Sequence, residues 1–318
     1  MKKIGVVVIG AGNIGQHHVR VYSTLKNVRL LAVCDSNIDT ASRIARKYHT
    51  RAYKDYKKLI EENPNIDCAS IAVPTSYHQL ISTYFMKRNI NVLLEKPIAQ
   101  TLDDAEEILR TAESNQVKLM IGHVERFNPG VLKMKQLVKQ GKLGKIISIV
   151  SKRVGVFPPS VSDMNVFLDL GIHEVDIINS IMEEHPQIIQ KHAVKSHAAR
   201  QEDAGEIFLL YKDAAAFIQV NWITPVKIRS LSITGTKGYA ELDYINQTLT
   251  VHKAKLNKHF ETYADFLRFS DSKTENISVE KAEPLRKEIE YFVDVVRGKK
   301  SLQMTQEEIL QSLAICLK

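Results

Sequence analysis

The 318-residue sequence has no apolar stretch that approaches the ~20 residues needed for a membrane-spanning helix. It therefore predicts no membrane partner. An apolar, strand-like run begins within the first residues, with no leader-like segment before it, so we expect no signal peptide. The three cysteines, Cys34, Cys68 and Cys316, have neither metal-site nor disulfide spacing. Packed, reduced thiols are typical of a cytoplasmic protein, which is the expectation here.

The sequence also lacks the signs of a nucleic-acid-binding protein. The formal charge is +8, but the lysines are spread along the chain without interleaved aromatic residues. The mild concentration of lysine at 133–145 is therefore interpreted as a solvated helix face, and no nucleic-acid partner is expected. A basic surface also suits an anionic small-molecule substrate. The content of 44% hydrophobic and 25% charged residues is typical of a globular protein of one or two domains.

The N-terminus of the chain is an apolar run without alternation that ends in Gly10, Gly12 and Gly15, spaced G-x-G-x-x-G. The run predicts a strand buried on both faces, as in a parallel sheet. Gly10 permits a tight turn, Gly12 lets the backbone approach a pyrophosphate, and Gly15 lets the next helix pack closely on the strand. The first residues of that helix, Asn13 and Ile14, would present free N–H groups to the phosphates.

A second strand-like run ends in Asp35, 20 residues after Gly15. This is about where the ribose-binding carboxylate of a dinucleotide fold belongs. Strand, glycines, helix, strand and acid together predict dinucleotide binding, although a glycine-rich turn alone would not. A carboxylate at Asp35 accepts from both ribose hydroxyls and repels a 2′-phosphate, which favours NAD over NADP. Ser36 and Asn37 could still cradle a phosphate, so dual use remains open.

Strands and helices alternate through the first 125 residues. Helices are expected at 13–26, 39–48, 55–63, 77–89 and 103–115. Further strands are expected at 51–53, 66–73, 90–94 and 118–124. The alternation predicts an α/β domain with a doubly wound parallel sheet covered by helices on both faces. Ligands of such sheets lie beyond the carboxyl ends of the strands, so the residues that follow each strand are candidate site residues.

Two of these strand ends carry such residues. Pro74, Thr75 and His78 follow the fourth strand; Pro74 ends it and Thr75 can cap the next helix, which is an equally good explanation of this turn. Glu95 and Lys96 follow the fifth strand. An acid and a lysine at a strand end, fixed by the proline that comes next, indicate a site rather than a turn.

A series of strand-like runs after residue 144 predicts a second domain. Strand-like runs occur at 145–154, 187–196, 206–211, 214–222, 230–234, 239–243 and 248–254. Runs of strands after α/β units predict an α+β domain, which places the domains at 1–125 and 126–318. Helices close the chain at 285–297 and 306–317, and the polar stretch 271–280 is expected to be a surface loop.

The stretch 166–182 predicts one amphipathic helix that places Asp169, His173 and Asp176 on one face. An aspartate one turn before a histidine can orient the imidazole, although a surface i,i+4 pair is a common alternative. Gly171 inside a helix costs roughly 1 kcal/mol relative to alanine, which indicates close approach of backbone or ligand. A zinc site is disfavoured because the second histidine of H-E-x-x-H is missing, and no metal is expected.

At these residues the sequence resembles the Gfo/Idh/MocA family (glucose–fructose oxidoreductase, inositol dehydrogenase and rhizopine catabolism) over nearly its whole length. The resemblance is carried by the glycine fingerprint, Pro74 through His78, Glu95-Lys96-Pro97 and Asp169-x-x-x-His173. It implies an N-terminal Rossmann domain and a C-terminal domain with a large, mostly antiparallel sheet. The second domain would bind substrate, and its open face would form a homodimer or homotetramer.

The resemblance also implies an NAD(P)-dependent dehydrogenase that oxidises a secondary hydroxyl of a sugar, with hydride transfer to nicotinamide. A neutral histidine with a pKa near ~6.5 suits removal of the hydroxyl proton. His173 is thus implied as general base, Asp169 as its orienting residue and Lys96 as the group that stabilises developing negative charge. The cofactor-binding residues are expected to be Gly10, Gly12, Asn13, Ile14, Asp35, Pro74, Thr75, His78, Glu95 and Lys96, with NADP as an alternative cofactor.

The segments 121–129 and 154–159 resemble a narrower branch, the UDP-N-acetylglucosamine 3-dehydrogenases. There Arg126 would pair with a diphosphate through its rigid fork, although an interdomain salt bridge explains it equally well. The expected substrate-binding residues are Arg126, Asn128, Lys96 and His173. The branch often has Val-His-Asp where this chain has Gly171-Ile-His-Glu174, a departure that leaves His173 in place.

Three other functions remain open. A dehydrogenase of inositol or another free sugar would use the same residues. A glycosidase that oxidises its substrate transiently with bound NAD would cleave glycosides without net NADH. A non-catalytic NAD-binding sensor would need none of Lys96, Asp169 and His173, so their presence together argues against it.

Overall fold

The computed structural model describes residues 2–156, 164–196, 201–256, 262–263 and 270–318. They form two compact units. The first comprises the described residues up to Val124 together with Met164 and 283–317, and the second comprises the other described residues from 125 to 282 together with Lys318. Among the described residues no helix is long and apolar enough to cross a membrane.

The first unit is built on a parallel sheet in the order β3-β2-β1-β4-β5-β6. Its strands are β1 (Ile4–Ile9), β2 (Val28–Cys34), β3 (Arg51–Tyr53), β4 (Cys68–Ile71), β5 (Asn91–Glu95) and β6 (Leu119–Gly122). Its helices are α1 (Gly15–Thr24), α2 (Ile38–Lys47), α3 (Tyr56–Glu62), α4 (His78–Met86), α5 (Leu102–Ser114), α9 (Pro284–Val296) and α10 (Gln306–Leu317). The expected doubly wound sheet is confirmed, with its strand order reversing direction between β1 and β4.

Local sequence explains most of these elements. The apolar residues of β1 from Val6 to Ile9 are buried, as a strand covered on both faces requires. Asn37 accepts hydrogen bonds from backbone N–H groups at the start of α2, Asp55 does so for α3, and Thr101 does so for α5. These caps satisfy N–H groups that a helix leaves without internal partners, so each helix begins where its cap residue stands.

The last two helices were expected in the second domain, 126–318, but both belong to the first unit. α9 lies against α1, and α10 lies against α5. The apolar face of α9, which includes Ile289, Phe292 and Val293, is fully buried there. Sequence order therefore predicts the wrong partner for these helices, since a terminal helix packs wherever an uncovered apolar surface remains.

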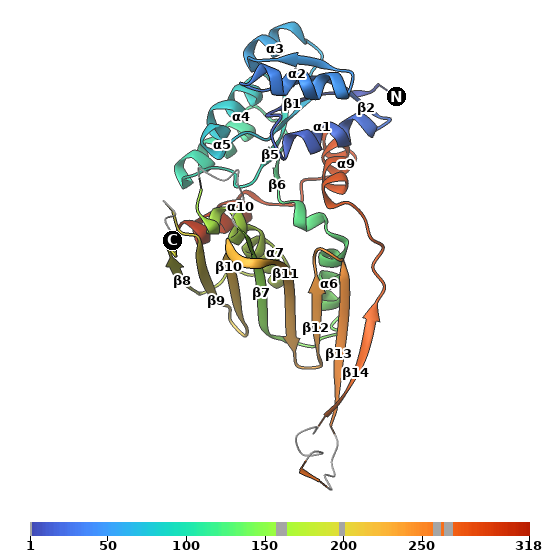
Figure 1. Cartoon of the computed structure of the whole chain (residues 1–318), viewed down its shortest axis with the longest axis vertical. Coiled ribbons are helices and arrows are strands. Elements are labelled where there is room, and N and C mark those ends of the chain that lie inside the picture. Colours follow the sequence, from blue (N-terminus) through green and yellow to red (C-terminus); the bar gives the residue numbers. More distant parts are fainter. Residues whose placement is uncertain (1, 157–163, 197–200, 257–261, 264–269) are drawn as a thin grey trace. The chain divides into compact units, whose positions relative to one another are not determined.

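The second unit contains an eight-stranded sheet in the order β14-β13-β12-β11-β7-β10-β9-β8, antiparallel except between β7 and β10. Its strands are β7 (Ile146–Val156), β8 (Ile188–Val194), β9 (Ala204–Leu210), β10 (Ala215–Asn221), β11 (Ile223–Gly235), β12 (Gly238–Asp243), β13 (Thr248–Leu256) and β14 (Ser270–Ile277). Its α-helices are α6 (Pro129–Lys139) and α7 (Ile172–Met182), which pack against the sheet (Figure 1). The large, mostly antiparallel sheet is confirmed.

Three local expectations for this unit are wrong. The expected loop at 271–280 is largely β14, which pairs with β13 from Ser270 to Ile277; its polar residues suit an edge strand because pairing uses only the backbone. β11 begins at Ile223, seven residues before the expected start, although Pro225 and a register irregularity lie in that part. The expected single helix at 166–182 is a π-helical turn, Phe167–Gly171, followed by α7.

Candidate active site

The three glycines of the N-terminal loop have different surroundings, each matching one expected role. Gly10 has a φ of +90°, and a Cβ there would overlap the carbonyl oxygen of Ala72. A Cβ on Gly15 would overlap the carbonyl oxygen of Gly10, so only glycine lets α1 approach β1 so closely. A Cβ on Gly12 would meet nothing within 4 Å. The backbone at Gly12 is thus open to a ligand, as a pyrophosphate requires.

The N-terminus of α1 adjoins this open loop. Ile14 is the N-cap residue and makes no side-chain cap hydrogen bond, unlike the caps of α2, α3 and α5. Asn13 and Ile14 are both exposed, with 51% of Ile14 accessible. An exposed helix start without a side-chain cap suits an anion, because the helix dipole and unsatisfied N–H groups attract negative charge.

Asp35 ties the end of β2 to the glycine loop. One carboxylate oxygen accepts from the backbone N–H of Ala11 at 2.8 Å, and the other accepts from that of Asn37 at 2.9 Å. Each carboxylate oxygen can accept a further hydrogen bond, so the group can still receive ribose hydroxyls. The side-chain oxygen of Asn37 caps α2. Of Ser36 and Asn37, the two residues expected to be able to hold a phosphate, Asn37 is therefore already engaged.

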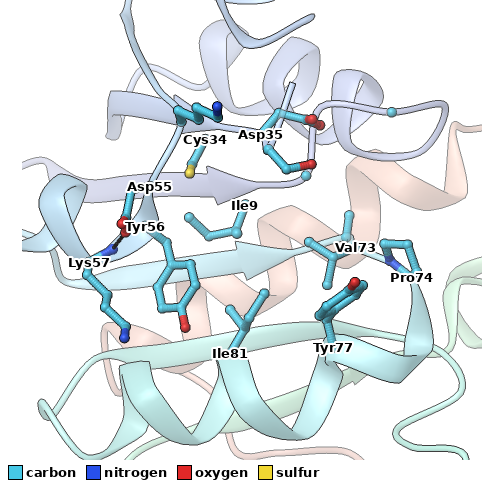
Figure 2. A pocket seen from close by; sticks show the side chains of 15 residues that line it. Ile9, Cys34, Asp35, Asp55, Tyr56, Lys57, Val73, Pro74, Tyr77 and Ile81 are labelled. Carbon is cyan, nitrogen blue, oxygen red and sulfur yellow. Dashed lines mark hydrogen bonds between the residues drawn. The ribbon is translucent and has the colours of Figure 1, made fainter. Parts of the chain in front are cut away.

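A cavity of about 800 Å³ lies at this edge of the sheet (Figure 2). Gly10, Gly12, Asp35 and Pro74 line it, whereas the other expected cofactor residues are not part of its lining among the described residues. Figure 2 shows Asp35 beyond the end of β2, with Val73, Pro74 and Tyr77 beyond β4. The chemistry fits NAD: an open glycine backbone and helix start for the pyrophosphate, and a carboxylate for the ribose.

Several lining residues were missed in the sequence. Lys54 and Tyr56 follow β3, and Tyr77 lies in the turn between β4 and α4. Their position directly after a strand of the parallel sheet is the sequence signal for the first two. Lys54 and Ser36 line the same cavity as Asp35, so dual use of NADP stays open.

His78 holds together two strand ends rather than lining the cavity. Its ring nitrogens lie 2.9 Å from the carbonyl oxygen of Pro97 and 3.0 Å from that of Val73. Burial lowers the pKa of His78. These contacts link the turn after β4 to the segment that carries Lys96, whose peptide bond to Pro97 is cis. Thr75, in the same turn, is buried.

Glu95 ends β5 and belongs to a buried polar chain. Its carboxylate lies 3.0 Å from Nε2 of His18 and also accepts from the backbone N–H of Lys96 at 3.2 Å. Nδ1 of His18 lies 2.9 Å from the Ser70 hydroxyl, which is also within 3.2 Å of Tyr22. Burial alone would raise the pKa of Glu95, but the contacts with His18 outweigh burial and lower it. Glu95 is therefore an ionised group fixed beside Lys96.

In the second unit, Asp169 and His173 lie on the π-helical turn and the start of α7. The indole Nε1–H of Trp222 donates to a carboxylate oxygen of Asp169 at 3.2 Å. Only 8% of His173 is exposed. π-helical turns are rare and frequent at functional sites. The sequence did not reveal Trp222 as a partner, because it lies 53 residues further along the chain.

Gly171 does not make the expected close approach. A Cβ there would stand at ordinary contact distances, 3.6 Å from Phe167 and 3.7 Å from Ile207. The expectation that another backbone segment passes close to this glycine is therefore wrong. A close approach does occur at Gly205 of β9, where a Cβ would overlap the ring of Phe167.

Arg126 and Asn128, the two residues of the segment 121–129 expected to bind substrate, have side chains that bond to other protein groups. Arg126 forms a bidentate ion pair with Asp176, from Nε and Nη2, at 2.8–3.0 Å. Asn128 caps α6 and donates to Glu125 and to the carbonyl oxygen of Tyr244. Of the segment 154–159, Val154 to Val156 end β7, and residues 157–159 lie outside the described residues.

Glu174, the residue at which the chain has Glu instead of the Asp of Val-His-Asp, is fully buried and has polar partners. Its carboxylate binds Arg153 and Ser151 and accepts from the Tyr244 hydroxyl at 2.9 Å. Arg153 also donates to Glu125 at 2.8 Å. Burial would lower the pKa of Arg153, but the charges of Glu174 and Glu125 outweigh it and raise it. Glu174 therefore anchors α7, and with it His173, to the sheet.

A doubly wound sheet with this glycine loop and an acid after β2 defines the NAD-binding Rossmann oxidoreductases. Two family models match the chain: "Oxidoreductase family, NAD-binding Rossmann fold" over residues 4–123, and "GFO/IDH/MocA C-terminal domain" over residues 131–241. The chain belongs to the Gfo/Idh/MocA family of NAD-binding oxidoreductases. Among the described residues there is no group of three or more His, Cys, Asp or Glu that could hold a metal ion.

Individual relatives have modest identity. The chain is 26% identical over 245 residues to UDP-N-acetylglucosamine 3-dehydrogenase of Acidithiobacillus ferrooxidans, covering 77% of this chain and 75% of that protein. It is 27% identical over 291 residues to myo-inositol 2-dehydrogenase of Thermotoga maritima, covering 86% of each. A solved structure of the Acidithiobacillus enzyme has a TM-score of 0.85 at 23% identity, covering 100% of this chain and 96% of that one. At this identity the likeness concerns the fold.

Proposed function

We propose that this oxidoreductase is a dehydrogenase that oxidises a secondary hydroxyl group of a sugar. The observation that carries the proposal is that Asp169, which is held by Trp222, lies four residues before the nearly buried His173. A carboxylate one helical turn before a histidine suits removal of a hydroxyl proton, because its charge can stabilise the imidazolium that results. NAD, held by the glycine loop and Asp35, supplies the hydride acceptor.

The residues of the chain have separate roles in this proposal. His173 in its neutral form takes the hydroxyl proton at an imidazole nitrogen as the carbonyl group forms. Asp169 orients the ring and stabilises its charged form, while Trp222 holds Asp169. Lys96 supplies a cation that stabilises the negative charge developing on the substrate oxygen. Glu95, ionised and bonded to the Lys96 backbone, fixes the segment that carries this lysine.

The substrate we propose is a UDP-linked N-acetylhexosamine oxidised at its 3-hydroxyl. The support is the similarity to the Acidithiobacillus 3-dehydrogenase and the resemblance of residues 121–129 to that branch. The second candidate is inositol or another neutral polyol, which the similarity to the Thermotoga inositol dehydrogenase favours. A diphosphate separates the two substrate classes, since only the first carries one.

The test is a substrate panel with purified protein, containing UDP-N-acetylglucosamine, myo-inositol and glucose with NAD or NADP. NADH formation is followed by absorbance and the product by mass spectrometry. We expect slow NAD-dependent conversion of UDP-N-acetylglucosamine to a 3-keto product. Much faster turnover of inositol or glucose would replace the proposed substrate. Glycoside cleavage without net NADH would indicate a glycosidase, and NAD binding without turnover of any compound would indicate a sensor.

We also propose that the sheet of the second unit forms a homo-oligomer. Phe217 of β10 pairs across the sheet with Phe208 of β9 and with Val150 of β7. The centroids of the Phe208 and Phe217 rings lie 4.9 Å apart with the rings tilted at 50°, and 51% of Phe217 is exposed. Three neighbouring apolar side chains on an open sheet face favour burial against a second copy of the chain.

A further inference from the structure

The second unit contains two arginines at directly opposed positions in neighbouring strands. Arg153 of β7 pairs with Arg229 of the antiparallel strand β11. Like charges directly opposite each other destabilise a sheet, so such a pair needs a counter-charge or a function. Both side chains lie on the sheet face that carries α7, because Arg153 there contacts Glu174.

The two arginines are neutralised to different degrees. Arg153 is buried and forms ion pairs with Glu174 and Glu125. Arg229 is half-buried, and among the described residues no hydrogen bond or ion pair to its guanidinium group occurs. The nearby carboxylates of Glu125, Glu174 and Asp169 act on it only through longer-range attraction. Burial and the charge of Arg153 lower the pKa of Arg229 to about 10, which still leaves the guanidinium charged at neutral pH.

Lys227 adds a second cation to the same place. A Cβ on Gly155 would stand 3.9 Å from the Cβ of Lys227, so Lys227 lies opposite Gly155. Gly155 is two residues after Arg153 on β7, which places Lys227 on the same sheet face as Arg153 and Arg229. The charge of Arg229 is the largest of the influences that lower the pKa of Lys227, which indicates that the cations are close. Lys227 is exposed and, among the described residues, has no ion-pair partner. An arginine fork beside an ammonium group, half-buried and without partners, is suited to bind a phosphate.

We propose that Arg229 and Lys227 form an anion subsite for the diphosphate of the substrate, an inference that rests on the proposed nucleotide-sugar dehydrogenase. Two observations favour a place beside the reaction centre. Arg153, which pairs with Arg229 across the two strands, binds Glu174, the residue that follows the proposed base His173. The charge of Asp169 influences Arg229, and Asp169 is the orienting residue of the proposed base. Arg126, the arginine expected to bind the diphosphate, is instead paired with Asp176. An anion at Arg229 would also relieve its repulsion with Arg153.

The test measures binding of inorganic pyrophosphate and of UDP to the protein saturated with NAD, which occupies the glycine loop of the first unit. Calorimetry gives the affinity, and the fluorescence of Trp222, the single tryptophan, gives a second signal. Arg229→Gln should weaken both ligands by about tenfold to a hundredfold, the range for a lost charge-assisted hydrogen bond. Lys227→Gln should weaken them less. The matched control is Lys152→Gln, next to Arg153 on the opposite sheet face, which should bind as wild type does.

The activity assay separates this inference from the proposed function. Arg229→Gln should raise KM for UDP-N-acetylglucosamine and leave KM for a neutral polyol unchanged. Oxidation of the nucleotide sugar with unchanged KM in Arg229→Gln would overturn the subsite and leave the function standing. Pyrophosphate binding that depends on Arg229 in a protein that oxidises only neutral sugars would support the subsite and overturn the substrate.

Folding of the variant is itself informative. Arg229→Gln removes the repulsion with Arg153, so its thermal unfolding temperature should be at least that of wild type. Arg229→Lys keeps the charge and should restore part of the pyrophosphate affinity. A fall in the unfolding temperature of Arg229→Gln, with unchanged pyrophosphate binding in Arg229→Lys and Lys227→Gln, would show that Arg229 is a structural residue.

Discussion

Replacement of Glu288 should stabilise the first unit and remove a pH-dependent loss of stability. Glu288 lies in α9 with no accessible surface, and among the described residues neither carboxylate oxygen has a hydrogen-bond partner. Burial raises the pKa of Glu288 well above its usual range, and the charge of Glu95 raises it further. The folded protein therefore keeps Glu288 protonated at pH values where the unfolded chain ionises it.

The sign of the effect follows from proton binding. Above the ordinary pKa of glutamate, about 4.3, the unfolded chain releases the Glu288 proton while the folded state retains it. The folded state then binds more protons, so the free energy of unfolding falls as pH rises, by up to about 1.4 kcal/mol per pH unit for one group. The fall ends where pH passes the raised pKa of the folded state.

The assay is hydrogen exchange of the α9 amides, measured from about pH 5 to pH 7 and corrected for intrinsic exchange rates, which gives the free energy of local opening. Glu288→Gln should remove the slope. Glu288→Met should also remove the buried polar atoms and add about 1–3 kcal/mol at every pH. The control is Glu290→Gln on the same helix, a partly exposed carboxylate paired with Arg286 at 2.9 Å. A slope that persists in Glu288→Gln would refute the argument.

Four further predictions concern the site and the sheet. Asp35→Ser should lower the ratio of kcat/KM for NAD to that for NADP, and a wild type that prefers NADP would contradict the assignment. His173→Ala should lose about 10²–10⁴ in single-turnover hydride transfer at saturating cofactor with unchanged cofactor affinity, whereas a loss below about threefold would exclude His173 as base. Trp222→Phe should lower kcat by about tenfold, because Asp169 loses a hydrogen bond to its charged carboxylate. It should also move the acid limb of the kcat/KM profile to lower pH, because Asp169 then stabilises the imidazolium of His173 less. An unchanged pH profile would refute this role of Trp222. Phe217→Asp should yield a smaller particle in light scattering, and an unchanged mass would place the interface elsewhere.

The sequence by itself determined the parts of the site that depend on local backbone geometry. The glycine spacing, the acid after β2 and the caps of α2, α3 and α5 act within a few residues of their own positions. Gly10 must reach a positive φ, and Gly15 must let α1 approach β1, so residue type and spacing are sufficient. The alternation of strands and helices determined the parallel sheet in the same way, because a strand buried on both faces is a short apolar run and each helix shows its own period.

Only the tertiary structure decided which distant side chains meet. Arg126 is paired with Asp176, 50 residues away, and Trp222 holds Asp169 from a strand 53 residues further on. Arg229 faces Arg153 because β11 extends through Pro225, where the sequence predicted no strand. These pairings depend on strand order and register, which the sequence pattern of one segment does not specify.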